Sequence, residues 1–250
     1  MSTDDCIIGL FIRVDSRMAA VPKHPDAHLY PSEVVTLGLL FALKGVGQRA
    51  FYRWLHNNYR AWFPGLPERT RLFRLFATHA DWTASFLAPP TPLGGADSYG
   101  IELIHPWRED RADRQIGGKG LSNHRWIVGA KLAYLVNQYG VVVAWDYAVA
   151  NAPDNAFRDL IADFQEQMVV FTDMSFHAAG GDPPNQKACK RGRWNVRMVV
   201  ETILSLLTTV CHLKKASQRT WAGLGHVWRT PWRCSIFSCC GTESRWMSRG

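Results

Sequence analysis

The sequence predicts an α/β fold in which a mixed sheet with flanking helices follows a small helical N-terminal region. Residues up to about 81 carry helix-like patterns, and strand-like segments appear only after a segment rich in proline and glycine. The later order is strand, hairpin, helix, strand, loop, helix, which builds a mixed sheet with helices packed on it. With 250 residues, 47% of them hydrophobic, the chain is long enough to bury a sizeable core.

Three segments of the N-terminal region indicate helices. The first, "PSEVVTLGLLFALKGV", has a start signal in Pro31, Ser32 and Glu33 ahead of an apolar run. Residues 47–63 and 68–87 interleave aromatic and leucine residues with arginine. Such interleaving suits a small DNA-binding bundle, and equally any helical bundle whose arginine stems cover apolar surface. We therefore expect residues 1–90 to be helical, with DNA binding as one of two interpretations.

The segment "APPTPLGG", residues 88–95, predicts a linker because it holds three prolines and two glycines. Beyond it we expect two strands joined by a turn at residues 137–140, within residues 124–150. The other expected elements, in chain order, are a strand over 96–104, a polar loop over 110–120, a helix over 153–167, an apolar strand over 168–173, a loop over 180–193 and a helix over 191–210.

The remaining features narrow the class of protein. Residues 230–250 show no period and hold three of the six cysteines, so we expect a disordered or aberrant tail. The absence of Cys-x-x-Cys pairs and of histidine pairs at zinc spacing argues against a structural zinc site, and free thiols are the simplest state. No apolar run reaches the roughly 18 residues of a membrane span, and the acidic N-terminus argues against a signal peptide. We expect a cytoplasmic protein with no membrane partner.

The formal net charge of +8 is unevenly distributed. From Gly181 onward there are twelve Lys and Arg residues and three acids, so the preceding 180 residues are almost neutral, at −1. A basic excess of this kind indicates a polyanionic partner, most simply nucleic acid, although a solvated basic surface would give the same count.

Three carboxylate residues lie at positions that suit a metal-binding catalytic site. Asp97 falls in the first strand, Asp173 ends the apolar strand, and Glu201 flanks the apolar face of the last helix. Open α/β sheets bind ligands at the carboxyl ends of strands, and a helix after such a strand packs back across the sheet. Clustered acids repel one another unless divalent cations bind, and ligation by oxygen alone selects Mg²⁺ or Mn²⁺. The plainer interpretation is a turn aspartate and a glutamate paired with Arg197.

From residue 30 to about residue 228 the chain resembles a DDE transposase of a bacterial insertion sequence, which has an RNase H-like catalytic domain. Three blocks carry the resemblance: "ADSYGIELI", "VVFTDMSFHA" and "GDPPNQKACKRGRWNVRMVVETILSLLT". The most specific feature is the pair Arg197-x-x-x-Glu201 on the final helix after a basic loop. The run "RWIVGAKLAYLVNQYGVVVAWDYAVANAPDN" is similar to the family's second and third strands. Trp194 stands where many relatives have tyrosine, and Thr208 where some have lysine.

The resemblance implies an RNase H-like domain over residues 91–229 that cleaves and joins phosphodiester bonds at the ends of a mobile element. Asp97, Asp173 and Glu201 would be the catalytic residues and would bind two Mg²⁺ or Mn²⁺ ions. The partners would be element-end DNA and target DNA, with a homodimer as the active form, in the nucleoid of a bacterial cytoplasm. The residues expected to contact DNA are Lys187, Lys190, Arg191, Arg193, Trp194 and Arg197.

Two alternatives stay open at this point. One is an RNase H-like nuclease, in which no DNA 3′-hydroxyl attacks the target strand. The other is an inactive transposase remnant that binds DNA or has no activity, which the unusual tail and the substitutions at Trp194 and Thr208 favour.

Overall fold

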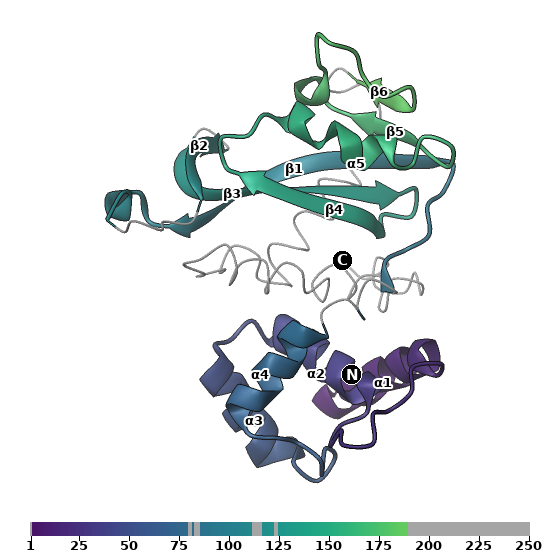
Figure 1. Cartoon of the computed structure of the whole chain (residues 1–250), viewed down its shortest axis with the longest axis vertical. Coiled ribbons are helices and arrows are strands. Elements are labelled where there is room, and N and C mark those ends of the chain that lie inside the picture. Colours follow the sequence, from purple (N-terminus) through teal and green to yellow (C-terminus); the bar gives the residue numbers. More distant parts are fainter. Residues whose placement is uncertain (1, 80–81, 83–85, 112–116, 123–124, 190–250) are drawn as a thin grey trace. The chain divides into compact units, whose positions relative to one another are not determined.

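The computed structural model describes residues 2–79, 82, 86–111, 117–122 and 125–189 (Figure 1). The chain divides into two compact units, with a boundary between Phe86 and Leu87. Within the described residues, the first unit is helical and the second contains a mixed sheet with short helices. The mixed α/β fold class predicted from the sequence is therefore confirmed.

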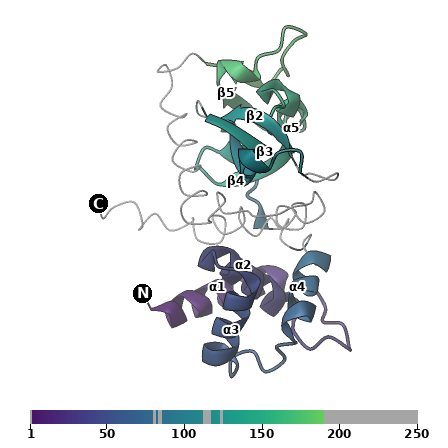
Figure 2. The same ribbon diagram turned by 90° about the vertical axis from the view of Figure 1, so that its left-hand side faces the viewer.

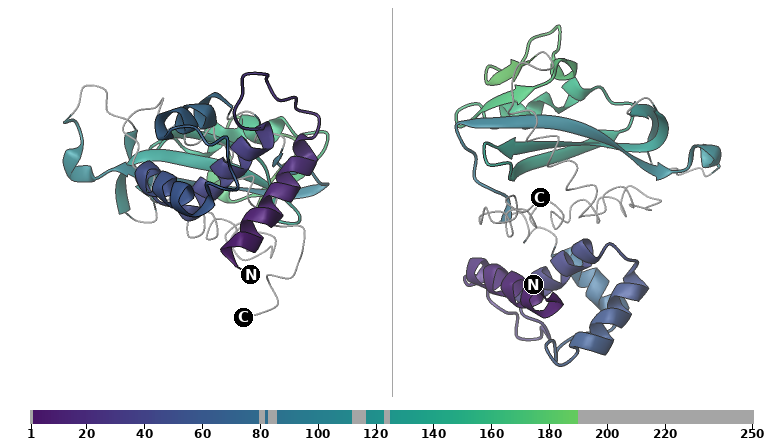
Figure 3. Two further views of the ribbon diagram at one scale, coloured as in Figure 1. Left: turned by 90° about the horizontal axis from the view of Figure 1, so that it is seen from below. Right: turned by 180° about the vertical axis from the view of Figure 1, so that it is seen from behind.

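The helical unit contains α1 (Thr3–Met18), α2 (Pro31–Lys44), α3 (Gln48–Tyr59) and α4 (Arg69–Thr78), coloured purple to blue in Figure 3. The start signal of α2 is confirmed, since Pro31 is its first residue and the Tyr30 amide donates to the Glu33 carboxylate over 2.7 Å. The helix ends at Gly45, whose φ of 59° is the left-handed conformation that glycine adopts without strain.

Aromatic side chains form the contact between α2, α3 and α4. The Phe41 ring lies 5.1 Å from that of Phe51 and 4.9 Å from that of Phe73, both in edge-to-face arrangements. Pairs of this geometry add to the stabilisation that apolar burial provides. The Tyr59 hydroxyl also ties α3 to α1 by donating to Asp4 over 2.9 Å.

Among the described residues, no single helix is long and apolar enough to cross a membrane. In the part of the chain that the structure describes, α2 and α3 taken together reach that length and composition, and the chain bends by 119° between them.

The sheet contains β1 (Leu93–Ile104), β2 (Gly118–Ser122), β3 (Arg125–Asn137), β4 (Val142–Val149), β5 (Val169–Thr172) and β6 (Gln186–Ala188). β2, β3, β1, β5 and β6 follow one another across the sheet, and β4 pairs with β3 (Figure 1). The pairs among β1, β2, β3 and β4 are antiparallel, whereas β1–β5 and β5–β6 are parallel. The predicted hairpin is thus confirmed as β3 and β4.

One face of the sheet packs against α5 (Arg158–Ala162) and the 3₁₀ turns η3 (Asp154–Phe157) and η4 (Met174–Phe176), as the end view in Figure 2 shows for α5. Phe157, Ile161 and Phe176 from these elements are almost fully buried. They contact small and branched side chains of the strands, among them Ala133 and Leu135. Burial of this apolar surface is the main term that holds the unit together.

The expected linker over residues 88–95 is too long, because β1 begins at Leu93. Gly94 and Gly95 are buried and pair with both β3 and β5. A Cβ on Gly94 would collide with the Val136 carbonyl and the Met168 side chain. The two glycines therefore serve close packing between strands, and not chain flexibility as we expected.

Three further boundaries differ from expectation. The expected helix over 153–167 is only η3 and α5, since the amides of Phe164, Gln165 and Gln167 bond to carbonyls three residues earlier and tighten the chain into turns. The expected loop over 110–120 already contains the first residues of β2. The expected loop over 180–193 contains β6, which is too short for alternation to reveal. The helix over 191–210 and the tail over 230–250 lie outside the described residues.

We predict that Gly129→Ala destabilises the sheet, because a Cβ there would overlap the Ile101 carbonyl oxygen of the neighbouring strand. Overpacking of this kind costs about 1–3 kcal/mol. Gly9→Ala is the control, since nothing lies within 4 Å of a Cβ on this residue of α1, and it should stabilise by about 0.5–1 kcal/mol. Chemical denaturation of the two variants measures both effects, and equal stabilities would contradict the packing argument.

Candidate active site on two parallel strands

The parallel pairing of β1 and β5 sets the positions of the first two predicted acids. Leu93, Gly94 and Gly95 pair with Val169, Val170 and Phe171. Continued by two residues, this register brings Asp97 to the level of Asp173, which directly follows the end of β5. The two aspartates therefore lie at matching heights on neighbouring strands, although 75 residues separate them in the sequence.

Asp173 is held by the turn that follows β5. It is the N-cap of η4, and its Oδ1 accepts hydrogen bonds from the Ser175 amide, over 3.0 Å, and from the Ser175 hydroxyl. The side chain is partly exposed. Such a turn fixes the direction of the carboxylate.

Asp97 lies within β1, where it pairs with Tyr134 of β3. The Ser98 amide donates to its Oδ1 over 2.8 Å, and the residue is partly buried. Because side chains alternate along a strand, Asp97 and Ser98 point to opposite faces of the sheet. Asp97 thus shares the face of Tyr134, which is fully buried.

A partly buried polar cluster lies on the face of the sheet that α5 covers. Lys131 of β3 donates to Asp154 Oδ1 over 2.9 Å, and the Ser98 hydroxyl donates to the same oxygen over 2.5 Å. Ser175 also hydrogen bonds to Asp154, so this serine lies between the carboxylates of Asp154 and Asp173. The cluster connects β1, β3, η3 and η4, and so supports the turn that carries Asp173.

Burial by itself would raise the pKa of Asp154, but hydrogen bonds from Ser175, Ser98 and Lys131, with the charge of Lys131, outweigh it and lower the pKa. The ion pair between Lys131 and Asp154 was not predicted from the sequence. Its signal in the sequence was Lys131 within the otherwise apolar segment "WIVGAKLAYLV", since a cation at the centre of a buried strand requires a partner.

The turn after η4 is closed by a second pair. His177 Nδ1 and Asp182 Oδ2 lie 2.7 Å apart, and Asp182 Oδ1 accepts the Ala178 amide over 2.9 Å. The hydrogen bond with His177 is the main reason why the pKa of Asp182 is lowered. This pair shapes the chain between Asp173 and β6.

Lys187 is the one predicted DNA-contacting residue that falls in the described part of the chain. It is exposed on β6 and pairs with Phe171 of β5, next to the strand end that carries Asp173. Glu201 and the other predicted contacts lie outside the described residues: Lys190, Arg191, Arg193, Trp194 and Arg197.

Oxygen ligands from Asp97 and Asp173 would suit Mg²⁺ or Mn²⁺. Within the described ranges, no group of three or more His, Cys, Asp or Glu side chains could hold a metal ion. The expected site needs Glu201 as its third acid, and that residue is outside those ranges.

No model of a known protein family matches this chain, and no curated protein matches it.

We predict that Asp154→Asn lowers stability by about 1–3 kcal/mol at neutral pH, because Lys131 then stays largely buried without its charged partner. The contribution of Asp154 is fully present above its unfolded pKa of 3.8 and is lost as pH falls through its lower folded pKa. The stability gap between wild type and variant should therefore narrow below pH 3.8. Urea unfolding of both proteins at neutral pH and below pH 3.8 measures this difference in stability.

Asp163→Asn is the matched control, since Asp163 is exposed at the end of α5. It should leave stability within about 0.5 kcal/mol of wild type. If the difference in stability between wild type and Asp154→Asn stays constant with pH, the charge of the Asp154 carboxylate does not contribute to stability.

Proposed function

We propose that this protein is a DNA transposase with an RNase H-like catalytic domain, which cleaves and joins phosphodiester bonds at the ends of a mobile element. The observation that carries the proposal is the β1–β5 register, which brings Asp97 and Asp173 to the same level on adjacent parallel strands. The antiparallel strands β1, β3 and β4, followed by β5 parallel to β1 and β6 parallel to β5, support an RNase H-like fold. The sequence blocks around both aspartates and around Glu201 support the same family.

In this proposal Asp97, Asp173 and Glu201 present anionic oxygens to two Mg²⁺ or Mn²⁺ ions. When bound, such ions stabilise the charge that develops at phosphorus and on the leaving oxygen. Ser175 and the Asp154 cluster keep the Asp173 carboxylate in place before DNA arrives. A carboxylate held in this way loses less conformational freedom on binding an ion.

The basic residues between Lys187 and Arg197 would position the DNA. Their charges contact phosphates, which sets affinity and position more than choice of sequence. The reaction has two displacements. Water first attacks phosphorus at the element end and displaces a 3′-hydroxyl. That hydroxyl then attacks a phosphorus of the target strand and displaces the target 3′-oxygen.

We predict that Asp97→Asn, Asp173→Asn and Glu201→Gln each reduce Mg²⁺-dependent DNA cleavage by at least about a hundredfold, since even an outer-shell partner of a metal contributes tenfold to a hundredfold. Mg²⁺ should raise the thermal unfolding midpoint of the wild type, because it binds the folded state. All three variants should lose that rise together. The measurements are cleavage of element-end duplex and unfolding with and without Mg²⁺.

Asp146→Asn is the control, because Asp146 is exposed on β4 and bonds to the Tyr147 amide that follows it. It should keep both the metal response and the activity. A supercoiled target in the same reaction separates transposase from nuclease, since only a transposase yields joined products. Retention of the metal response and cleavage by Glu201→Gln would refute the three-carboxylate site.

A further inference from the structure

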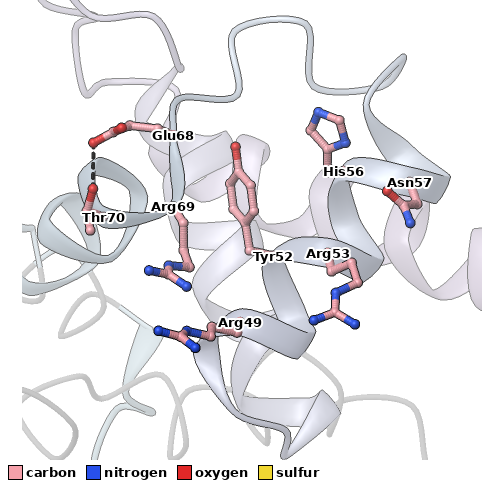
Figure 4. A pocket seen from close by; sticks show the side chains of 8 residues that line it. All are labelled: Arg49, Tyr52, Arg53, His56, Asn57, Glu68, Arg69 and Thr70. Atoms are coloured by element: carbon pink, nitrogen blue, oxygen red, sulfur yellow. Dashed lines mark hydrogen bonds between the residues drawn. The ribbon is translucent and has the colours of Figure 1, made fainter.

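An open hollow of about 640 Å³ lies between α3 and the start of α4 in the helical unit (Figure 4). Its volume falls within the range of roughly 300–1,000 Å³ that small-molecule sites occupy. Residues of α3 line one side of the hollow, and residues at the start of α4 line the other. The candidate active site uses none of these residues, so the hollow needs an occupant of its own.

The described lining of the hollow is positively charged. Arg49 and Arg53 line it from α3, and Arg69 lines it from α4. Glu68 is the one acid in this lining, so its net charge is +2 with histidine neutral. Glu68 Oε1 already accepts the Thr70 hydroxyl over 2.5 Å. In the part of the chain that the structure describes, none of the three arginines forms an ion pair with a carboxylate.

Arg49 and Arg69 approach the same part of the hollow from different helices. Figure 4 shows both guanidinium groups on the same side of the Tyr52 ring. A guanidinium stays charged in proteins, so loss of a proton cannot relieve the repulsion between two of them. An anion between them does relieve it, and phosphate oxygens match the paired N–H groups of arginine. This part of the hollow therefore suits a phosphate chain.

The wall next to the arginines is aromatic and polar. The rings of Tyr52 and His56 lie 6.1 Å apart between centroids and are tilted by 31°. The Tyr52 hydroxyl donates to the Pro67 carbonyl over 2.9 Å, which fixes the ring before a ligand arrives. His56 and Asn57 are exposed. Nucleobases stack on tyrosine and histidine rings and form hydrogen bonds to side-chain amides, so this wall suits a base.

The length of the hollow distinguishes a nucleotide from a simple phosphate. Arg49 and His56 are seven residues apart, which is about 10 Å along the axis of α3. Inorganic phosphate is too small to contact both ends, whereas a nucleotide carries its phosphates and its base at opposite ends of a ribose. Arg53 lies between the two ends, one turn along α3 from Arg49.

We propose that the hollow binds a free nucleoside diphosphate or triphosphate. Its phosphates lie between Arg49 and Arg69, and its base lies against Tyr52 and His56. Duplex DNA would satisfy the arginines, but its bases stack on one another and would leave the aromatic wall unused. The bound nucleotide contacts both α3 and α4 and so stabilises the helical unit. This inference does not rest on the proposed function.

The test is calorimetric titration of the full chain with adenosine diphosphate (ADP), in EDTA and at about 0.15 M salt, which screens exposed charges. One ADP should bind per chain, at least about fivefold tighter than pyrophosphate, because stacking of the base adds to the phosphate contacts. Adenosine lacks the phosphates and should bind at least about tenfold more weakly than ADP. Equal affinities for ADP and pyrophosphate, or no binding of ADP, would overturn the inference.

Two variants separate the phosphate end from the base end. Arg69→Gln should weaken both ADP and pyrophosphate at least about tenfold, because a charged hydrogen-bond donor is lost. His56→Ala should weaken ADP about fivefold and leave pyrophosphate unchanged, because only the base contacts this ring. Thermal unfolding checks that each variant is folded.

Arg74→Gln is the matched control, because Arg74 is exposed on α4 but does not line the hollow. It should bind ADP as the wild type does. If Arg69→Gln and Arg74→Gln weaken ADP equally, the binding reflects general charge and the hollow is not the site. A duplex oligonucleotide whose binding Arg69→Gln weakens, in a chain that binds no ADP, would assign the hollow to DNA instead.

The outcome is independent of catalysis. Asp97→Asn should bind ADP as the wild type does, because Asp97 lies on β1 in the other unit. A chain that cleaves DNA but binds no ADP would reject the nucleotide site and leave the transposase proposal standing. A chain that binds ADP in the hollow but never cleaves DNA would reject the transposase proposal alone.

Discussion

The second unit depends on the parallel pairing between β1 and β5. This contact is only three residues long, yet it joins the antiparallel strands on one side of the sheet to β5 and β6 on the other. Parallel strands cannot be joined by a tight turn, so the chain must cross over through the hairpin, η3 and α5 before it returns. The same register sets the heights of Asp97 and Asp173, so the candidate site follows directly from the pairing.

The partly buried polar cluster around Asp154 is the second constraint. A lysine on a central strand is costly to bury, and its cost is offset only when its partner is close and well bonded. Asp154 meets that condition with hydrogen bonds from Lys131, Ser98 and Ser175. Because these residues come from four separate elements, the cluster fixes η3 and η4 relative to the strands. Asp173 gains a defined orientation as a consequence.

The distribution of charge differs between the sequence and the fold. Residues 1–180 are nearly neutral in sum, and the basic excess lies beyond Gly181. Helices α3 and α4 contain arginines and no Asp or Glu, whereas α1 contains Asp4 and Asp5. A polyanion responds to the local field of one surface and not to the sum over a segment. The arginines of α3 and α4 therefore form a second basic region, besides the one beyond Gly181 that the net charge indicated.

The sequence by itself determined the elements whose signals are local. The start of α2 at Pro31, the hairpin turn in which Asn137 Oδ1 accepts the Val141 amide over 3.0 Å, and the apolar strand before Asp173 all follow from neighbouring residues. The sequence also predicted Asp97 and Asp173 as candidate catalytic residues. Only the tertiary structure decided that Gly94 and Gly95 belong to β1, that β6 exists and that Lys131 pairs with Asp154. Partners far away in the chain make these contacts, and no local pattern encodes such partners.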